Sequence, residues 1–285
     1  QLGAIGASDT PLSAGPFEED NYFSNGPNEP VSRGSAYPGY KNPDSSWETF
    51  WTPRQATHGT GGLAGVWAEE NSRDSIYSAM RRRETFATSG PRIQVRFFGG
   101  SLPLDIKDEA DPVSIAYSKG TPMGGMLDSS SEESPRFFVW ASRDPNAGWL
   151  QRVQIIKGWV EEGESFERVY DVACSDNLTP DSETHRCPDN QAKVNLKDCS
   201  VSNDKGAVSL RDAWVDPDFS PLQQAYYYVR VLENPSCRWS TWDAIRLGIP
   251  PNPDLAATHQ ERAWSSPIWY QPEKLASSRS DSFSR

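Results

Sequence analysis

The stretch RIQVRFF, residues 92–98, alternates polar and apolar side chains, so an extended strand here places Ile93, Val95 and Phe97 on one face. Similar short runs recur along the chain and are separated by turn residues. Evenly spaced strands without intervening helices are typical of a β-sandwich. We therefore expect residues 92–272 to form one β-sandwich domain. The other runs with a strand pattern are 84–88, 113–117, 136–141, 150–160, 165–171, 193–196 and 224–232.

The apolar positions of these runs also predict which side chains form the core. Register is strongly specified where one face of a sheet is buried, because a shift of one residue would turn the whole apolar set toward water. The side chains that we expect to face the core are Ile93, Val95, Phe97, Val139, Val153, Ile155, Val229 and Val231.

One segment, residues 72–83, has helical periodicity instead. Asn71 or Ser72 is a natural N-cap, and three consecutive arginines at 81–83 suit the negative end of the helix dipole. The apolar residues at helical spacing are Ile76, Ala79 and Met80.

The two ends of the chain and one long segment carry separate expectations. Residues 2–7 read as a buried strand, and because the chain starts on Gln1 within it, we expect a fragment or a processed form. Residues 16–62 form a long loop insert rich in Gly, Pro, Ser and Asn, of the kind that covers a functional site. Residues 273–285 are expected to be a disordered tail.

Composition limits the classes of protein to which the chain can belong. Its 285 residues suggest two domains at roughly 100–200 residues each, and 11 Trp, 10 Tyr and 11 Phe are enough for a substantial core. A net charge of −11 disfavours nucleic-acid binding by bulk electrostatics. No apolar run approaches the roughly 18 residues that a membrane-spanning helix needs.

Four cysteines lie within one stretch and lack the C-x-x-C spacing of a zinc site. The alternative to disulfides is four reduced thiols, and four cysteines allow three pairings. We predict Cys174–Cys187, which closes an irregular loop, and Cys199–Cys237, which ties a strand end to a turn. Two disulfides indicate an oxidising compartment, so we expect a periplasmic or extracellular protein.

Candidate functional residues are acidic and concentrate near the amino terminus. Asp9 directly follows an expected strand, where barrel enzymes place metal ligands. Possible residues lining the same site are Glu18, Glu19, Asp20, Glu69, Glu70 and Arg81. Each could instead be a helix cap or a solvated charge. The three histidines follow no metal-binding pattern and read as loop residues.

Long strings of uncommon residues provide a more specific signal, namely GASDTPLSAGPFEEDNYF at 6–23, GGLAGVWAEENSRDSIYSAMRRRETFATSGPRIQVRFFGG at 61–100 and QERAWSSPIWYQP at 260–272. In these strings the chain closely resembles a bacterial family, domain of unknown function 3604, over residues 1 to about 272. The amino-terminal half of family members resembles the polymerase-and-histidinol-phosphatase (PHP) superfamily. Those proteins are distorted β/α barrels that hold divalent metals with His and Asp and hydrolyse phosphoesters.

The resemblance implies that this chain is the carboxy-terminal portion of such a protein. Residues 1–91 would then be the last strand and helix elements of a PHP-like β/α barrel, with its insert at about 16–62, and the fold would be mainly β. The last metal motif of the barrel reads Ser-Asp-Thr-His, whereas this chain has Ser8-Asp9-Thr10-Pro11. Proline has no ligand atom, so Asp9 is the remaining candidate ligand for Zn²⁺, Mn²⁺ or a similar ion in the parent protein. One such carboxylate cannot hold the ion tightly, so we expect this chain alone to bind it weakly or not at all.

Two functions from different classes remain open. In the first, the chain is part of a metal-dependent phosphoester hydrolase, is inactive by itself, and has the missing amino-terminal half as its partner. In the second, it is a non-catalytic β-sandwich module that binds a carbohydrate, a lipid head group or a protein through exposed Trp and Tyr. The resemblance favours the first function for the parent protein, and the missing histidines favour the second for this chain.

Overall fold

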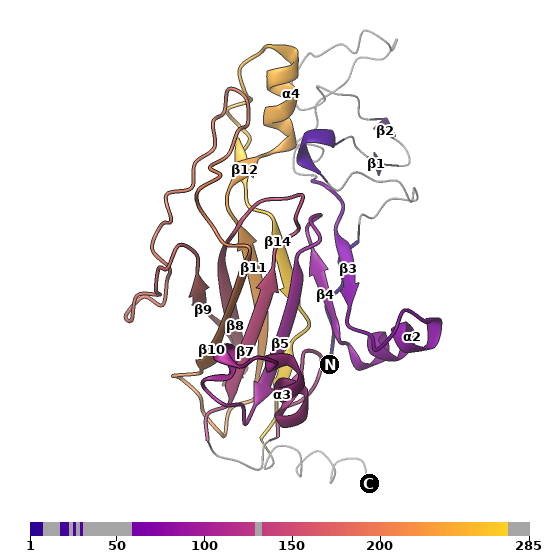
Figure 1. The fold of residues 1–285 in the computed structure, drawn as a ribbon, viewed down its shortest axis with the longest axis vertical. Coiled ribbons are helices and arrows are strands. Elements are labelled where there is room, and N and C mark those ends of the chain that lie inside the picture. Colours follow the sequence, from indigo (N-terminus) through magenta and orange to yellow (C-terminus); the bar gives the residue numbers. More distant parts are fainter. Residues whose placement is uncertain (8–17, 23–24, 27–28, 31–58, 129–132, 273–285) are drawn as a thin grey trace.

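Two antiparallel sheets packed face to face form the body of the molecule (Figure 1). The computed structural model describes residues 1–7, 18–22, 25–26, 29–30, 59–128 and 133–272. Within these residues the expected mainly β fold is confirmed. Asp9, most of the insert and the tail at 273–285 lie outside the described residues.

The smaller sheet has four strands and the larger has seven. In spatial order the smaller sheet contains β10 (Ser209–Val215), β7 (Arg136–Ser142), β5 (Gln94–Gly100) and β6 (Gly120–Pro122). The larger contains β3 (Leu63–Val66), β4 (Thr85–Thr88), β14 (Arg262–Ser265), β11 (Ala225–Glu233), β8 (Leu150–Glu161) and β9 (Glu164–Cys174), and β15 (Ile268–Tyr270) also pairs with β11. Strand β11 lies inside this sheet, with β8 on one side and β14 and β15 on the other.

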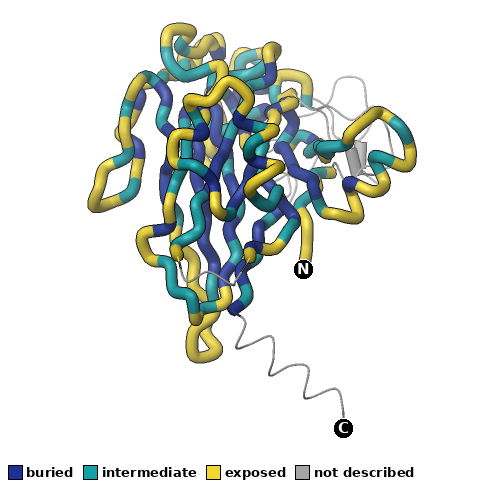
Figure 2. Tube along the Cα trace, turned by 60° about the horizontal axis from the view of Figure 1, so that its bottom comes forward, coloured by how far each residue is buried: buried dark blue, intermediate teal, exposed yellow. Residues whose placement is uncertain are grey.

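The core lies between the sheets, and all eight side chains predicted to face it have an exposed fraction of 0%. Figure 2 shows the buried residues along the middle of the strands and the exposed ones in the connecting loops. Phe137 from the smaller sheet contacts Tyr227 of β11 across the interface, with ring centroids 4.5 Å apart. Phe97 stacks on the same Phe137 ring at 5.5 Å. Alternation on each strand therefore produces one continuous aromatic and aliphatic layer.

The predicted helix is confirmed as α2 (Arg73–Arg82). The Ser72 side chain accepts a hydrogen bond from the Ser75 backbone N–H, which satisfies one of the free donors at the helix start. Arg83 adopts the left-handed conformation and ends the helix. Of its three predicted apolar positions only Ala79 is buried, while Met80 is 48% exposed.

The strand expected at 113–117 is wrong, because these residues belong to helix α3 (Pro112–Lys119). The Asp111 side chain accepts a hydrogen bond from the Ser114 backbone N–H, and Pro112 occupies the first turn. Both features favour the start of a helix over the β propensity of the residues that follow. A 3-10 turn, η2 (Ile106–Asp108), precedes this helix.

Two further strand expectations are wrong. Residues 193–196 make only an isolated bridge between Val194 and Val201. Residues 2–7 form no strand, and Leu2 and Ile5 are 76% and 63% exposed. This segment is tied to the body by single bonds, such as that from the Ala4 backbone N–H to Ser266 Oγ at 2.8 Å, and not by a ladder.

The segment that contains β3 and β4 does not form a sheet of its own. Strand β3 pairs antiparallel with β4, and β4 pairs antiparallel with β14 of the sandwich. The larger sheet therefore contains strands from both sides of the boundary expected at residue 91. No helix among the described residues is long and apolar enough to cross a membrane.

Short elements assemble at the end of the sandwich where β11 stops. Strand β12 (Ser236–Cys237) pairs with β13 (Thr258–His259), and helix α4 (Trp239–Leu247) follows β12. The 3-10 turn η1 (Glu19–Asn21) lies beside α4 at the top of Figure 1. The hairpin pair β1 (Asn25–Gly26) and β2 (Glu29–Pro30) follows η1 in the chain.

Both predicted disulfides are confirmed. Cys174 and Cys187 have Cα atoms 5.7 Å apart, and Cys199 and Cys237 have Cα atoms 5.6 Å apart. The second disulfide ties the long loop after β9 to β12, and so holds that loop against the end of the sandwich.

Replacing Phe137 by Ala should lower the free energy of unfolding by about 3–5 kcal/mol, because it removes a buried ring and leaves a cavity between the two sheets. The matched control is Phe166→Ala, since Phe166 is 45% exposed and its loss should cost less than about 1 kcal/mol. Urea unfolding followed by fluorescence measures both values. Equal losses in the two variants would contradict the face-to-face packing.

Candidate functional site

A cleft of about 640 Å³ lies at this end of the sandwich, between the loop at 18–21, the end of β11 and the start of α4. Six acidic residues line it, namely Glu18, Glu19, Asp20, Asp144, Glu233 and Glu261. Among the described residues that line the cleft, Arg92 is the only basic one. Acidic side chains therefore dominate the lining of the cleft.

Glu19 is held in the cleft by helix α4. The backbone N–H of Trp239, the first residue of α4, donates a hydrogen bond to Glu19 Oε2 at 2.5 Å. A carboxylate is stabilised at this position by the free N–H groups and the dipole of the helix. Thr60 Oγ donates to the other carboxylate oxygen, Glu19 Oε1, at 3.3 Å. Both oxygens of Glu19 are thus positioned by the fold.

His259 ends β13, which pairs with β12, and Glu261 follows between β13 and β14. They are two residues apart in extended chain, so their side chains lie on the same side. His259 Nε2 lies 3.9 Å from Glu19 Oε1 and 3.5 Å from Glu261 Oε1. One ligand atom from each of the three residues lies within 4.8 Å of the other two. We call these residues the acid–histidine cluster.

The acid–histidine cluster is largely shielded from water. The side chains of Glu19, Glu261 and His259 are 8%, 9% and 25% exposed. Glu261 Oε2 accepts a short hydrogen bond from Ser89 Oγ, which leaves Oε1 directed at the histidine. His259 Nε2 is itself buried and has no hydrogen-bond partner within the described part of the chain.

Burial shifts the protonation equilibria of the acid–histidine cluster. Desolvation raises the pKa of Glu261 to about 7, the Ser89 hydrogen bond opposes this rise, and the charge of Glu19 adds to it. Desolvation lowers the pKa of His259 and so favours the neutral imidazole, although the charge of Glu19 opposes the shift. A neutral imidazole nitrogen is a metal ligand as well as a proton acceptor.

Glu233, the last residue of β11, is a second unusual group in the cleft. It is 2% exposed, and its Oε2 accepts a hydrogen bond from the Gly148 backbone N–H at 3.0 Å. A Cβ atom at position 148 would come within 2.5 Å of Glu233 Oε2, so this approach requires glycine. Glu233 Oε1 has no hydrogen-bond partner among the described residues. Burial and, secondarily, the charge of Glu261 raise the Glu233 pKa to about 8.

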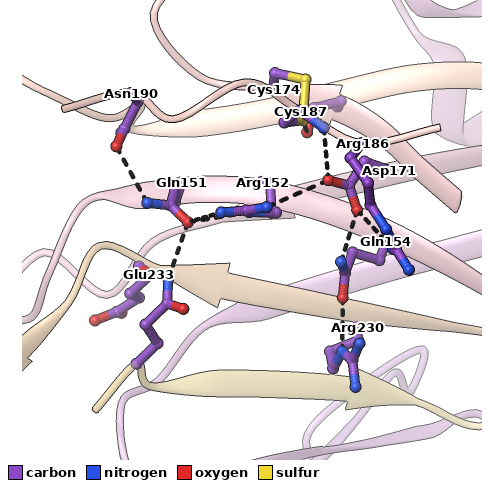
Figure 3. Close-up of polar contacts among 12 residues, drawn as sticks. Gln151, Arg152, Gln154, Asp171, Cys174, Arg186, Cys187, Asn190, Arg230 and Glu233 are labelled. Carbon is purple, nitrogen blue, oxygen red and sulfur yellow. Dashed lines mark hydrogen bonds and ion pairs between the residues drawn. A yellow bond between two sulfur atoms is a disulfide. The ribbon is translucent and has the colours of Figure 1, made fainter. Parts of the chain in front are cut away.

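A polar network behind the cleft supports this end of β11 (Figure 3). Gln260 Nε2 donates to the backbone carbonyl of Glu233 at 2.8 Å and to Gln151 Oε1 at 2.9 Å. Gln151 Nε2 in turn donates to Asn190 Oδ1 at 3.1 Å, in the loop that follows the Cys174–Cys187 disulfide. The network thus links the position of Glu233 to a disulfide-bonded loop.

Aromatic and amide side chains complete the lining. Trp149, Trp242, Asn146 and Asn234 all border the cleft. The Arg143 guanidinium lies 4.4 Å from the centre of the Trp149 ring and donates to the Pro145 carbonyl at 2.8 Å. The Arg143 guanidinium is therefore already occupied by contacts with residues beside the cleft.

The structure separates the candidate residues identified from sequence. Glu18, Glu19 and Asp20 line the cleft. Glu69 and Glu70 border a different hollow, beside α2, together with Arg82. Arg81 lies on α2 with its guanidinium 6.0 Å from the Tyr77 ring. Asp9 lies outside the described residues.

Sequence reasoning missed His259, Glu261 and Glu233. One usable signal was present, because His259-Gln260-Glu261 has the two-residue spacing that places both ligand-type side chains on one face of a strand. Reading His259 as a loop residue ignored that spacing. Nothing local in the sequence indicated that Glu19, 240 residues earlier, would join them.

The raised pKa of Glu233 predicts a pH-dependent stability with a defined sign. Its folded pKa of about 8 exceeds the value of 4.5 for a free glutamate side chain, so the folded chain keeps a proton that the unfolded chain releases. The free energy of unfolding should therefore fall as pH rises from 5 to 8, by up to about 1.4 kcal/mol per pH unit from this group. Urea unfolding in the presence of a chelator should show a shallower fall for Glu233→Gln, and an unchanged slope for the control Glu70→Gln. A Glu233→Gln slope equal to that of the wild type would contradict this account.

Comparison with known proteins gives one match. No curated protein and no solved structure matches the chain. One family model, described as "Protein of unknown function (DUF3604)", matches residues 1–272, which include both sheets and every described residue of the cleft. Because this match covers nearly the whole chain, the protein belongs to the DUF3604 family.

Proposed function

We propose that this chain forms part of a metal-dependent phosphoester hydrolase and that the cleft holds the substrate. The observation that carries the proposal is the convergence of buried carboxyl groups, Glu19, Glu233 and Glu261, in one open cleft at the loop end of the sandwich. Carboxyl groups with environments this different are the usual means of proton transfer in hydrolases.

The charge of the cleft favours metal dependence over a metal-free mechanism. A phosphoester is an anion, and the ionised carboxylates among the six acidic residues of this wall repel it. A bound divalent cation would offset this repulsion, polarise the ester and activate water. The cleft residues of this chain would then orient the ester and exclude bulk water, with Glu233 available as a proton donor from its Oε1 atom.

The wider proposal follows the family resemblance. We propose that the chain is the carboxy-terminal portion of a PHP-like protein whose amino-terminal half supplies further metal ligands, with Asp9 as one ligand from this chain. Two disulfides support a periplasmic or extracellular location, since such bonds persist in oxidising compartments.

A second candidate, carbohydrate binding without catalysis, is favoured by one observation. Trp149 and Trp242 border the cleft together with Asn146 and Asn234. Aromatic faces and amide or carboxyl groups suit the apolar faces and hydroxyl groups of a sugar. A neutral sugar would also avoid the repulsion that an anion meets in this cleft.

Turnover of a generic aryl phosphodiester tests the first candidate. The protein expressed with its amino-terminal half should show turnover that depends on Mn²⁺ or Zn²⁺, while the 285-residue chain alone should show none. Glu233→Gln should lower kcat by about 10²-fold or more, because it removes a positioned acid. Glu70→Gln, in the hollow beside α2, should leave kcat unchanged.

Two results would contradict the hydrolase proposal. One is full turnover by the Glu233→Gln variant. The other is an inactive long protein that binds soluble oligosaccharides in a manner abolished by Trp149→Ala, which would establish the second candidate instead.

A further inference from the structure

The acid–histidine cluster places one imidazole nitrogen and two carboxylate oxygens close together. Glu261 Oε1 and His259 Nε2 are 3.5 Å apart, and Nε2 has no hydrogen-bond partner in the described part of the chain. Glu19 Oε1 lies 3.9 Å from the same nitrogen. An arrangement of buried lone pairs that face one another is costly unless a proton or a cation lies among them.

We infer that Glu19, His259 and Glu261 form a binding site for one divalent transition-metal ion, of the Zn²⁺ or Mn²⁺ class, within this chain. One imidazole nitrogen and two carboxylate oxygens are a donor set that such ions accept, and three protein ligands leave a position open for water or substrate. The site uses none of the Ser8-Asp9-Thr10-Pro11 motif and stands independently of the proposed hydrolase activity.

The spacing of the three ligand atoms fits a metal ion of this size. Donors about 2.1 Å from a tetrahedral zinc lie about 3.4 Å from one another. The two distances to His259 Nε2, 3.5 and 3.9 Å, are close to this value, and all three ligand atoms lie within 4.8 Å of one another. Side-chain movements of up to about 1 Å would bring all three ligand atoms to bonding distance from one ion.

Hydrogen bonds from outside the acid–histidine cluster hold both carboxylates in this orientation. Ser89 Oγ donates to the outer oxygen of Glu261, and the Trp239 backbone N–H donates to the outer oxygen of Glu19. Ser89 Oγ is fixed in turn by the Arg262 backbone N–H at 2.8 Å. Metal ligands are commonly oriented by such supporting contacts. Of the inner atoms, Glu19 Oε1 also accepts a hydrogen bond from Thr60 Oγ at 3.3 Å, and a carboxylate oxygen has a further lone pair for an ion.

An independent observation in the same cleft also points to a missing partner. Glu233 is 2% exposed and lines the cleft with Glu261, yet its Oε1 atom has no hydrogen-bond partner among the described residues. A water molecule bound to the metal would give this oxygen a partner. The positive charges of Arg238 and Arg262 act on His259 and oppose the binding of a cation there. The metal site is therefore inferred from the positions of the three ligand atoms and not from the local net charge.

Calorimetric titration of the metal-free 285-residue chain with ZnCl₂ and MnCl₂ tests the site directly. We expect one ion per chain for at least one of the two metals. His259→Ala and Glu261→Gln should each weaken that affinity more than 10-fold. The matched controls, His185→Ala and Glu70→Gln, alter a histidine and a carboxylate outside the cleft and should bind as the wild type does.

Ser89→Ala provides a milder variant in case loss of a ligand disturbs folding. It removes a supporting hydrogen bond and leaves all three ligands in place, so affinity should fall about 10–100-fold. Circular dichroism confirms that each variant is folded, and the metal should raise the Tm of the wild type but not that of Glu261→Gln.

The inference is overturned if folded His259→Ala and Glu261→Gln chains bind the metal as the wild type does, or if the wild type binds neither ion at millimolar concentration. These readouts contain no substrate. Stoichiometric binding by this chain, together with no phosphodiesterase activity of the protein expressed with its amino-terminal half, would therefore overturn the proposed hydrolase and leave the metal site standing.

Discussion

Contact between Phe137 and Tyr227 joins the two sheets and fixes strand β11 within the larger one. Because β11 lies between β8 on one side and β14 and β15 on the other, its position is determined by packing and by hydrogen-bonded ladders on both sides. Its last residue, Glu233, is therefore carried to a defined place at the end of the sandwich. The Cys199–Cys237 disulfide then fixes the short strand that follows. The packing of the core therefore determines where Glu233 lies in the cleft.

Electrostatics in the cleft follow from that placement. Glu233 and Glu261 are buried beside each other, and desolvation is the largest cause of the rise in both pKa values. Water cannot stabilise their charges, so protons or a cation must. Glu19 is placed beside them by the start of α4, where the Trp239 backbone N–H donates to its Oε2 atom. A carboxylate fixed in this way next to an imidazole whose neutral form is favoured is a suitable arrangement for binding a metal ion.

The sequence predicts the sheets better than the cleft, for physical reasons. Alternation along 92–98 reports directly which side chains are buried, and all eight predicted core residues are buried. At 113–117, β propensity was overridden by the Asp111 cap and Pro112, which start a helix. Helix α4 was also missed, although it places Trp239 against Glu19. The acid–histidine cluster depends on tertiary contacts between residues 240 positions apart, and no local pattern encodes these.

Anomalous diffraction from crystals grown with ZnCl₂ would show whether the acid–histidine cluster binds a metal ion. Data collected on both sides of the zinc absorption edge locate the ion without reference to activity or substrate. We expect one strong anomalous peak within about 2.0–2.2 Å of Glu19 Oε1, His259 Nε2 and Glu261 Oε1. A well-ordered cleft without such a peak, in crystals that hold zinc elsewhere on the chain, would contradict it.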